Sequence, residues 1–360
     1  MVNLLISFTD ALSYALYILI ALLVLLVMIT VHEFGHYIVG KIFKFKINEF
    51  AIGFGPAIFK KTKKDGEVFS IRLLPLGGYC AFAGEDEDAL TEGDFNSKPP
   101  WQRILVLLAG ATMNFLTAIL VAGIFIGAYG TPAYRIETVR PTDMETGFVQ
   151  YFEQGDIIIG AEDKSVYLIT DLMSAIGSKK AGETITVTVL RNGTEKDVTI
   201  KLLQNEIESI ESTGETLSAL GIQSMRGTTV RFGFFTSIGK TFGYTFRLGA
   251  SIFEVLGQLL TGKLGLNAMG GTVTTITTTA NGVKNHGLGY LLQITALIGV
   301  NLSIFNLLPI PALDGCKTVF TLIEWIRGKP VNRKIEYILS IIGMVLLLGF
   351  AVIVDLQHCF

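Results

Sequence analysis

The chain has 360 residues, of which half are hydrophobic and 17% are charged, and its formal net charge is −2. Soluble domains usually carry about 25% charged residues, so this composition predicts a membrane protein with several spans and some soluble mass. The near-neutral charge, with no basic cluster interleaved with aromatic residues, argues against nucleic-acid binding. Cys80, Cys316 and Cys359 lack CxxC spacing, which argues against a disulfide framework or a cysteine metal site.

Four uncharged apolar segments are long enough to cross a bilayer at about 1.5 Å per residue. They are approximately Ala11–Val31, Ile104–Tyr129, Gly287–Leu313 and Tyr337–Val354. Lysines crowd the region after the first segment, and arginines and lysines lie between the third and fourth. By the positive-inside rule both basic loops are cytoplasmic, so both termini and the 131–286 region are expected to be extracytoplasmic.

The first apolar segment ends in the pattern His32-Glu33-Phe34-Gly35-His36. Positions i and i+4 share one face of a helix, so the imidazoles of His32 and His36 can bind one metal ion, with Glu33 beside them as a base for water. This HExxH pattern is typical of zinc hydrolases. Its position predicts a zinc site at membrane depth, toward the cytoplasmic side.

A third zinc ligand is predicted near the end of the third apolar segment. A carboxylate there is costly unless it meets a cation, metal or water, and catalytic zinc commonly takes three protein ligands. Asp314 is the acidic residue that the topology brings to the depth of the two histidines. Pro309 and Pro311 are expected to break the helix just before it, leaving backbone groups for a substrate strand.

Other candidate substrate-binding residues rest on weaker patterns. The segment Val68–Phe82 predicts two short apolar strands around a turn at 76–79, and the glycines Gly77 and Gly78 allow a backbone to approach closely. Such a hairpin could dip into the membrane and pair with an extended substrate, or it could be an ordinary surface hairpin. Asn301 and Asn306 could hold an unwound substrate, and a helix-packing role is an equal alternative.

Gly110 and Asn114 lie four residues apart within the second apolar segment. A small and a polar residue on one helix face favour close packing against another helix, with the amide hydrogen-bonding across the contact. We therefore predict a structural packing role for both residues, with support of the helix that carries the histidines as the alternative.

The composition between residues 131 and 204 is that of a soluble domain. The order of its predicted elements resembles that of a PDZ domain. These elements are Gly155-Asp156-Ile157, a short helix at Asp171–Ile176, and two strands around Arg191-Asn192-Gly193. A PDZ fold binds extended chain ends by strand addition, so a peptide ligand is expected, with a spacer role as the alternative. The predicted domain order is 1–130 membrane core, 131–204 PDZ-like domain, 205–286 linker with an amphipathic membrane-surface segment, and 287–360 membrane core.

The chain resembles the site-2 protease family of intramembrane zinc metalloproteases. The resemblance rests on a set of motifs in order along the chain: HEFGH, LPLGGY, Gly110-x-x-x-Asn114, the insertion, and Asn-x4-Asn-x2-Pro-x-Pro-x-Leu-Asp-Gly. The chain is most similar to the bacterial branch that releases sigma factors by cleaving anti-sigma factors. The resemblance implies that His32, His36 and Asp314 hold Zn²⁺ and that Glu33 is the catalytic base. It also implies that Asn301, Pro309 and Pro311 accommodate the substrate.

The expected fold is therefore a polytopic α-helical membrane protein with four transmembrane helices, a membrane-associated β-hairpin and an inserted PDZ-like α+β domain. Its expected partners are the lipid bilayer and single-span membrane proteins such as anti-sigma factors, and its expected location is a bacterial cell membrane. One alternative is a membrane-anchored zincin acting on soluble or surface substrates, which should take its third ligand from a soluble helix. Another is a non-catalytic metal-binding membrane protein, which has no need of Glu33.

Overall fold

The computed structural model describes residues 2–85, 91–143, 149–177, 179–180, 182–202, 217–265 and 270–357. The chain divides into two compact units, one made of Met1–Ala122 with Leu248–Phe360 and the other of Gly123–Arg247. Within the described residues, four helices are long and apolar enough to cross a membrane: Ala11–Ile42, Pro100–Tyr129, Thr272–Leu307 and Lys334–Gln357. Together with the β-sheets this confirms the predicted fold class, a multi-pass membrane protein with an inserted β domain.

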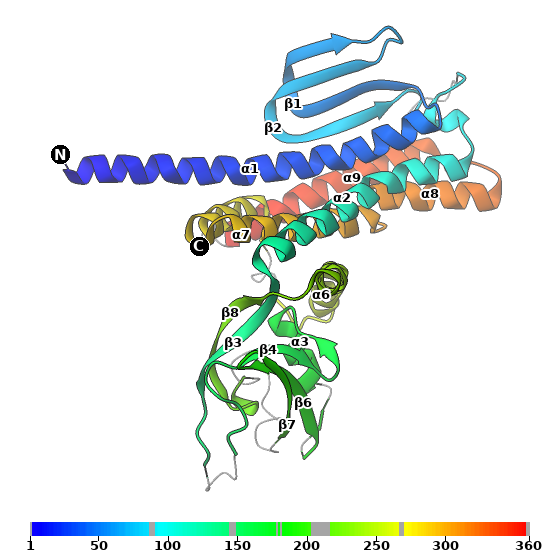
Figure 1. The fold of residues 1–360 in the computed structure, drawn as a ribbon. Helices are drawn as coiled ribbons and strands as arrows, with labels where there is room; N and C mark the ends of the chain where they lie inside the picture. The colour runs from blue at the N-terminus through cyan, green and yellow to red at the C-terminus, as the bar shows by residue number, and fades with distance from the viewer. Residues whose placement is uncertain are drawn as a thin grey trace. The chain divides into compact units, whose positions relative to one another are not determined.

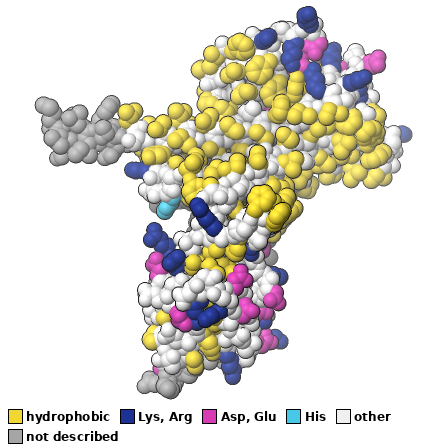
Figure 2. Space-filling view, viewed as in Figure 1, with side chains coloured by type: hydrophobic (Ala, Val, Ile, Leu, Met, Phe, Trp, Pro, Cys, Tyr) yellow, Lys and Arg dark blue, Asp and Glu magenta, His cyan; other side chains and the backbone are white. Residues whose placement is uncertain are grey.

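The first unit contains the long helices (Figure 1). They are α1 (Val2–Ile42), α7 (Thr272–Leu307), α8 (Asp314–Arg327) and α9 (Arg333–Gln357), with most of α2 (Pro100–Tyr129) and part of α6 (Phe234–Leu260). Yellow hydrophobic side chains cover much of these helices in Figure 2, as expected for surfaces that face lipid. Helices α1, α2 and α7 meet at Gly299, where an added Cβ would lie 2.8 Å from the Cε of Met28 and 3.1 Å from the Cβ of Ala118. Small residues therefore set this packing.

The third span differs from its prediction at both ends. Helix α7 begins at Thr272, continues past a non-helical residue at Gly287, and ends at Leu307. Threonine hydroxyls in its first turns donate to backbone carbonyls, for example from Thr275 to Gly271 at 2.8 Å and from Thr277 to Val273 at 2.9 Å. These hydrogen bonds give the threonine hydroxyls partners within the helix itself.

The first unit also holds a sheet formed by β1 (Ile47–Thr62) and β2 (Val68–Phe82), next to α1 in Figure 1. The predicted turn at 76–79 is wrong, because the two halves of β2 do not pair with each other. Glu49 is in register with both Val68 and Ala81, so the first half of β1 lies between the halves of β2. Gly53 and Gly55, with φ of 87° and 81°, bend β1 and make this arrangement possible. The second half of β1 then pairs with residues 68–72 from the other side.

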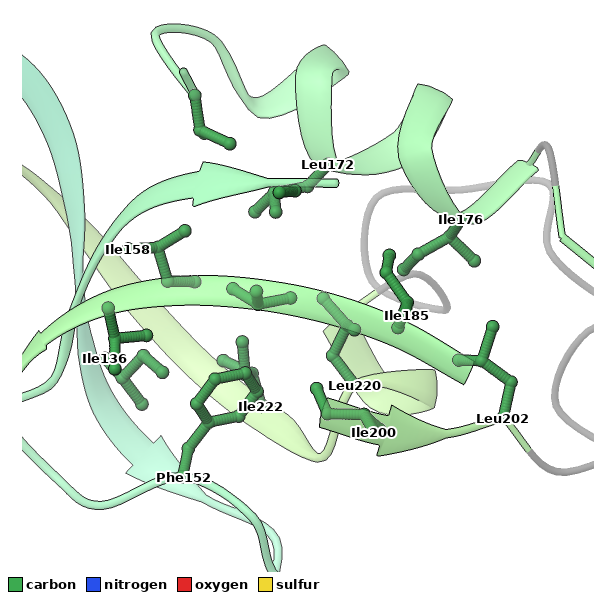
Figure 3. Close-up of a cluster of buried hydrophobic side chains, with 14 residues drawn as sticks. Ile136, Phe152, Ile158, Leu172, Ile176, Ile185, Ile200, Leu202, Leu220 and Ile222 are labelled. Atoms are coloured by element: carbon green, nitrogen blue, oxygen red, sulfur yellow. The ribbon is translucent and has the colours of Figure 1, made fainter. Parts of the chain in front are cut away.

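The second unit is an antiparallel sheet with strand order β7-β6-β4-β3-β8 and with β5 paired to β4. Its strands are β3 (Thr131–Val139), β4 (Ile157–Ala161), β5 (Lys164–Ser165), β6 (Thr184–Arg191), β7 (Thr194–Lys201) and β8 (Ile222–Val230), with helix α3 (Ile169–Gly177). Figure 3 shows its core, in which Ile136, Ile158, Ile185 and Ile222 are fully buried or nearly so. The predicted helix and strands of this region are present.

The predicted border at residue 204 lies outside the described residues. Beyond it, the predicted linker 205–286 contains β8, α6 and the first half of α7 among its described residues. Strand β8 pairs antiparallel with β3 along its length, for example Tyr134 with Gly227. The sheet thus takes a strand from a part of the chain whose sequence alternates only weakly between apolar and polar residues.

Candidate active site

The last turns of α1 place His32, Glu33 and His36 inside the first unit. The helical i, i+4 spacing brings the two imidazoles together, with their Nε2 atoms 3.1 Å apart and their rings nearly perpendicular at 84°. Both side chains are buried, with 7% and 6% of His32 and His36 exposed. Two buried imidazole nitrogens that point at one position can supply two of the four ligands of a tetrahedral metal ion.

Asp314 completes the group from a position 282 residues later in the chain. It is the first residue of α8, and its Oδ2 lies 2.9 Å from Nε2 of His32 and 3.2 Å from Nε2 of His36. Ligand atoms held at about 2.0 Å from a tetrahedral zinc ion lie about 3.3 Å from one another. The nearly equilateral triangle of 2.9, 3.1 and 3.2 Å therefore fits zinc.

The other nitrogen of each imidazole faces α2. Nδ1 of His36 lies 2.8 Å from the backbone carbonyl of Val106. A carbonyl can only accept, so Nδ1 carries the proton and Nε2 keeps its lone pair for a metal. Near Nδ1 of His32 lies the amide of Asn114, whose Nδ2 is 3.5 Å away and whose Oδ1 is buried without a partner. The two amide atoms are nearly equal in size, so exchanging them turns Oδ1 toward Nδ1 of His32 as an acceptor for an Nδ1–H.

Gly110 on α2 faces the two imidazoles directly. A Cβ at this position would lie 2.7 Å from Cε1 of His32 and 2.7 Å from Cε1 of His36, closer than such contacts allow. The sequence predicted helix packing for Gly110 and Asn114, and the structure places both against the histidine rings. A glycine is needed here because the rings occupy the space of its side chain.

Glu33 points to the β1–β2 sheet. Its Oε2 accepts a hydrogen bond of 2.9 Å from the backbone N–H of Cys80. Burial, followed by the charges of Glu33 and Glu85, raises the pKa of the Cys80 thiol, which therefore stays protonated. Glu33, His36 and Asp314 line one cavity of about 300 Å³ together with Tyr79 and Cys80.

The predicted substrate-binding residues are only partly brought to this site. Gly78 lies beside it, since an added Cβ would be 3.7 Å from Cγ of Glu33 and 2.8 Å from the carbonyl of Ala51. Gly77, with φ of 152°, instead packs against the ring of Phe54.

On the other side, α7 ends at Leu307, and Pro309 and Pro311 occupy the short link to Asp314, as predicted. The link includes Ala312, which has an unusual φ of 79°. Asn306 donates its amide to the carbonyl of Leu302 at 2.9 Å, within its own helix. Asn301 is half-buried two turns before the end of α7.

Sequence reasoning missed two contributors, the N–H of Cys80 and the carbonyl of Val106. Both are backbone groups, which leave no side-chain signal in a sequence. Among the described residues, the cluster of His32, His36 and Asp314 is the one group of three such side chains close enough to hold a metal ion. Its third member, Asp314, belongs to α8 and not to the inserted unit, whereas the zincin alternative expects a third ligand from a soluble helix.

Comparisons with known proteins agree with this geometry. Residues 20–350 match the model of Peptidase family M50. The protein called "Putative zinc metalloprotease CPE1693" in Clostridium perfringens is 31% identical over 348 residues, covering 95% of this chain and 98% of that protein. "Putative zinc metalloprotease FN1322" of Fusobacterium nucleatum is 30% identical, with 94% and 97% covered. Zinc metalloprotease RasP of Geobacillus kaustophilus is 28% identical, with 91% and 95% covered.

The family match covers most of the chain and includes both parts of the His-His-Asp cluster. The chain therefore belongs to peptidase family M50, the site-2 protease family of intramembrane zinc metalloproteases.

Proposed function

We propose that this zinc metalloprotease hydrolyses peptide bonds within the transmembrane segments of single-span membrane proteins. The observation that carries the proposal is the position of the His32, His36 and Asp314 triangle. The two histidines are on a helix long enough to span a membrane, and Asp314 follows a second such helix by seven residues. A substrate must therefore reach the site from within the bilayer or at its surface.

We assign Glu33 the role of catalytic base. Zinc held by His32, His36 and Asp314 supplies Lewis-acid polarisation of the scissile carbonyl and lowers the pKa of water. Glu33 lies in the same cavity and takes a proton from the attacking water, then returns it to the leaving amine. The hydrogen bond from Cys80 is to Oε2 of Glu33, which leaves Oε1 of the same carboxylate available for this transfer.

A substrate helix must unwind before it can be cut, because its peptide bonds are shielded by its own hydrogen bonds. We assign the edge of β2 around Gly78–Phe82 as the strand that receives the unwound segment by strand addition. Tyr79, Cys80, Ala81 and Phe82 line the cavity that holds Glu33, which supports this placement. Backbone groups freed near Pro309 and Pro311, with Asn301 and Asn306 on the adjoining helix, contact the substrate from the other side.

We place the metal site toward the cytoplasmic side of a bacterial cell membrane, with both termini and the inserted unit extracytoplasmic, on the distribution of basic residues. Water then enters from the cytoplasm. In support of this, a second cavity of about 510 Å³ shares Glu85, Phe95 and Lys317 with the cavity of the metal site. Its charged lining, which includes Arg103 and Glu324, suits water.

We infer that the inserted unit is a PDZ-like domain that binds or excludes substrates through a peptide ligand, and that anti-sigma factors are among the substrates. The Gly155-Asp156-Ile157 element, helix α3 and the β6–β7 hairpin support this inference. Helix α6 is attached to this unit through a hydrogen bond of 2.8 Å from Lys240 to Ser165. We assign its exposed apolar face to the membrane surface; the residues are Phe234, Phe235, Ile238, Phe242 and Phe246.

The proposal is tested with the full chain reconstituted in lipid vesicles together with a single-span substrate. Glu33→Gln should retain zinc and lose cleavage, whereas His32→Ala should lose both. Mass spectrometry of the wild-type products should place the cut within the apolar segment of the substrate. An active, zinc-replete Glu33→Gln variant would remove Glu33 as the base, and cuts confined to soluble parts of the substrate would reject intramembrane cleavage.

A further inference from the structure

Glu49 is the centre of a hydrogen-bond network on the β1–β2 sheet. Its Oε1 accepts from Oγ of Ser70 at 2.6 Å and from Nη2 of Arg72 at 2.7 Å. Its Oε2 accepts from the hydroxyl of Tyr79 at 2.8 Å. Burial works against ionisation, but these three hydrogen bonds outweigh it and lower the pKa of Glu49, so the carboxylate is charged at neutral pH.

The network joins three adjacent strand segments. Glu49 lies on the first half of β1, Ser70 and Arg72 on the first half of β2, and Tyr79 on its second half. Arg72 strengthens the connection, because its guanidinium lies 5.3 Å from the ring centroid of Tyr79 and its Nη1 donates to the carbonyl of Gly55 at 2.8 Å. The side chain of Tyr79 is therefore held at its hydroxyl and over its ring.

The residue after Tyr79 makes the contact to the active site. Cys80 donates its backbone N–H to Oε2 of Glu33 at 2.9 Å. The peptide group between residues 79 and 80 is planar and rigid, so the direction of this N–H follows the backbone of Tyr79, which the held side chain restrains. The network and Glu33 are thus connected through a single peptide plane.

We propose that Glu49 is a positioning residue, which acts through Tyr79 to fix the Cys80 N–H that orients Glu33. The inference rests on the proposed role of Glu33 as the base. The ion pair with Arg72 neutralises the charge of Glu49, so the network orients the catalytic carboxylate without placing a further net negative charge in the same sheet. Misplacing a catalytic group by about 1 Å can cost roughly 100-fold in rate, which makes such support functionally significant.

A purely structural role for Glu49 is the competing explanation, and the same sheet offers a matched control. Glu67 is also a buried acid, 2% exposed, and it forms ion pairs with Lys41 and, at 2.7 Å, with Lys63. It lies next to the start of β2, away from the 79–80 peptide in the chain. Replacing Glu67 removes two ion pairs beside the sheet and leaves the Tyr79 connection intact.

The experiment compares Glu49→Leu, Glu49→Gln, Tyr79→Phe and Glu67→Gln in the full-length protein in lipid vesicles. For Glu49→Leu and Tyr79→Phe, kcat should fall roughly ten-fold or more, with KM and zinc content within about two-fold of wild type. Hydrogen exchange at the Cys80 amide, followed in peptides covering residues 78–82, should accelerate in both. Glu49→Gln should recover most of kcat, because its amide oxygen still accepts from Tyr79, and Glu67→Gln should keep kcat and the exchange rate.

Several results would overturn the proposal: an unchanged kcat in Tyr79→Phe, a rise in KM alone, or an equal loss of kcat in Glu67→Gln. If Glu49→Leu does not fold, Tyr79→Phe, which lacks a single hydroxyl, decides the question. The amide exchange is measured without any turnover. Failure of the proposed function would appear as an active Glu33→Gln variant, whereas failure of this inference leaves Glu33→Gln inactive and Tyr79→Phe fully active.

Discussion

Asn114 on α2 and His32 on α1 meet inside the membrane unit, where the buried amide lies 3.5 Å from Nδ1 of the imidazole. Nδ2 is the nearer amide atom, and Oδ1 is buried without a partner; exchanging the two atoms turns the oxygen toward a ring nitrogen that must carry a proton if Nε2 is to bind zinc. The contact joins α1, which carries two of the proposed ligands, to α2, which carries none of them.

We expect Asn114→Leu to weaken zinc binding by roughly 10- to 100-fold, because the Nδ1–H of His32 loses its acceptor and the ring its fixed orientation. Asn114→Asp, which retains an acceptor, should bind zinc more tightly than Asn114→Leu. Zinc affinity is measured by competition with a chelator. Thr112→Val on the exposed side of α2 is the control, and equal affinities in wild type and Asn114→Leu would refute the role.

Gly110→Ala should abolish zinc binding, since its methyl group would overlap both imidazoles. Elsewhere in a helix interior the same change is favourable by about 0.5–1 kcal/mol. Gly127→Ala, at a position with nothing within 4 Å of an added Cβ, should therefore leave zinc content unchanged and slightly raise Tm. Thermal unfolding and metal analysis of the two variants test this contrast, and a zinc-replete Gly110→Ala protein would contradict it.

Removal of zinc by a chelator should abolish activity and lower Tm, and both should return when zinc is added. Saturation at 100 times Kd stabilises the folded state by about 2.7 kcal/mol. Asp314→Asn, which keeps the shape but loses the charged ligand, should show a much smaller rise in Tm with zinc. If Asp314→Asn binds zinc as wild type does while His32→Ala loses it, Asp314 is not a ligand.

The stability contributed by Glu67 should depend on pH. Burial opposes its ionisation, but hydrogen bonds from Lys41 and Lys63 lower its pKa below the ordinary value of 4.5. The contribution is therefore complete above pH 4.5 and is lost as pH falls through the folded pKa. We expect the Tm of wild type to exceed that of Glu67→Gln by about 2–4 °C at neutral pH, for a difference of about 1 kcal/mol. This gap should close in acid, and a gap independent of pH would contradict the expectation.

The sequence predicted the metal cluster because it depends on two simple rules. The spacing of His32 and His36 places them on one helix face, and a carboxylate at the end of an apolar span needs a partner, which identified Asp314. Both rules concern side chains whose chemistry is visible in the sequence. For Gly110 and Asn114 the sequence predicts helix packing or support of the metal-bearing helix, and it does not decide between them because a sequence does not show which helix face meets which.

The sheet beside the site could not be predicted in the same way. Its register depends on the bend at Gly53 and Gly55, which lets one half of β1 pair on both edges. Strand patterns show which residues alternate, but they do not show which strands become neighbours. For the same reason β8 was assigned to a linker, although it pairs with β3 along its length.

The distance in sequence between the ligands affects how the enzyme is made. Asp314 is synthesised 282 residues after His32, which at about 5–20 residues per second takes roughly 15 to 60 s. During this interval the first helices carry His32, His36 and the proposed base Glu33, but the proposed third ligand has not been made. With Asp314 as the proposed third ligand, we expect a chain that ends before α8 to be unable to cut its neighbours, so the layout of the chain would delay proteolysis until translation is nearly complete.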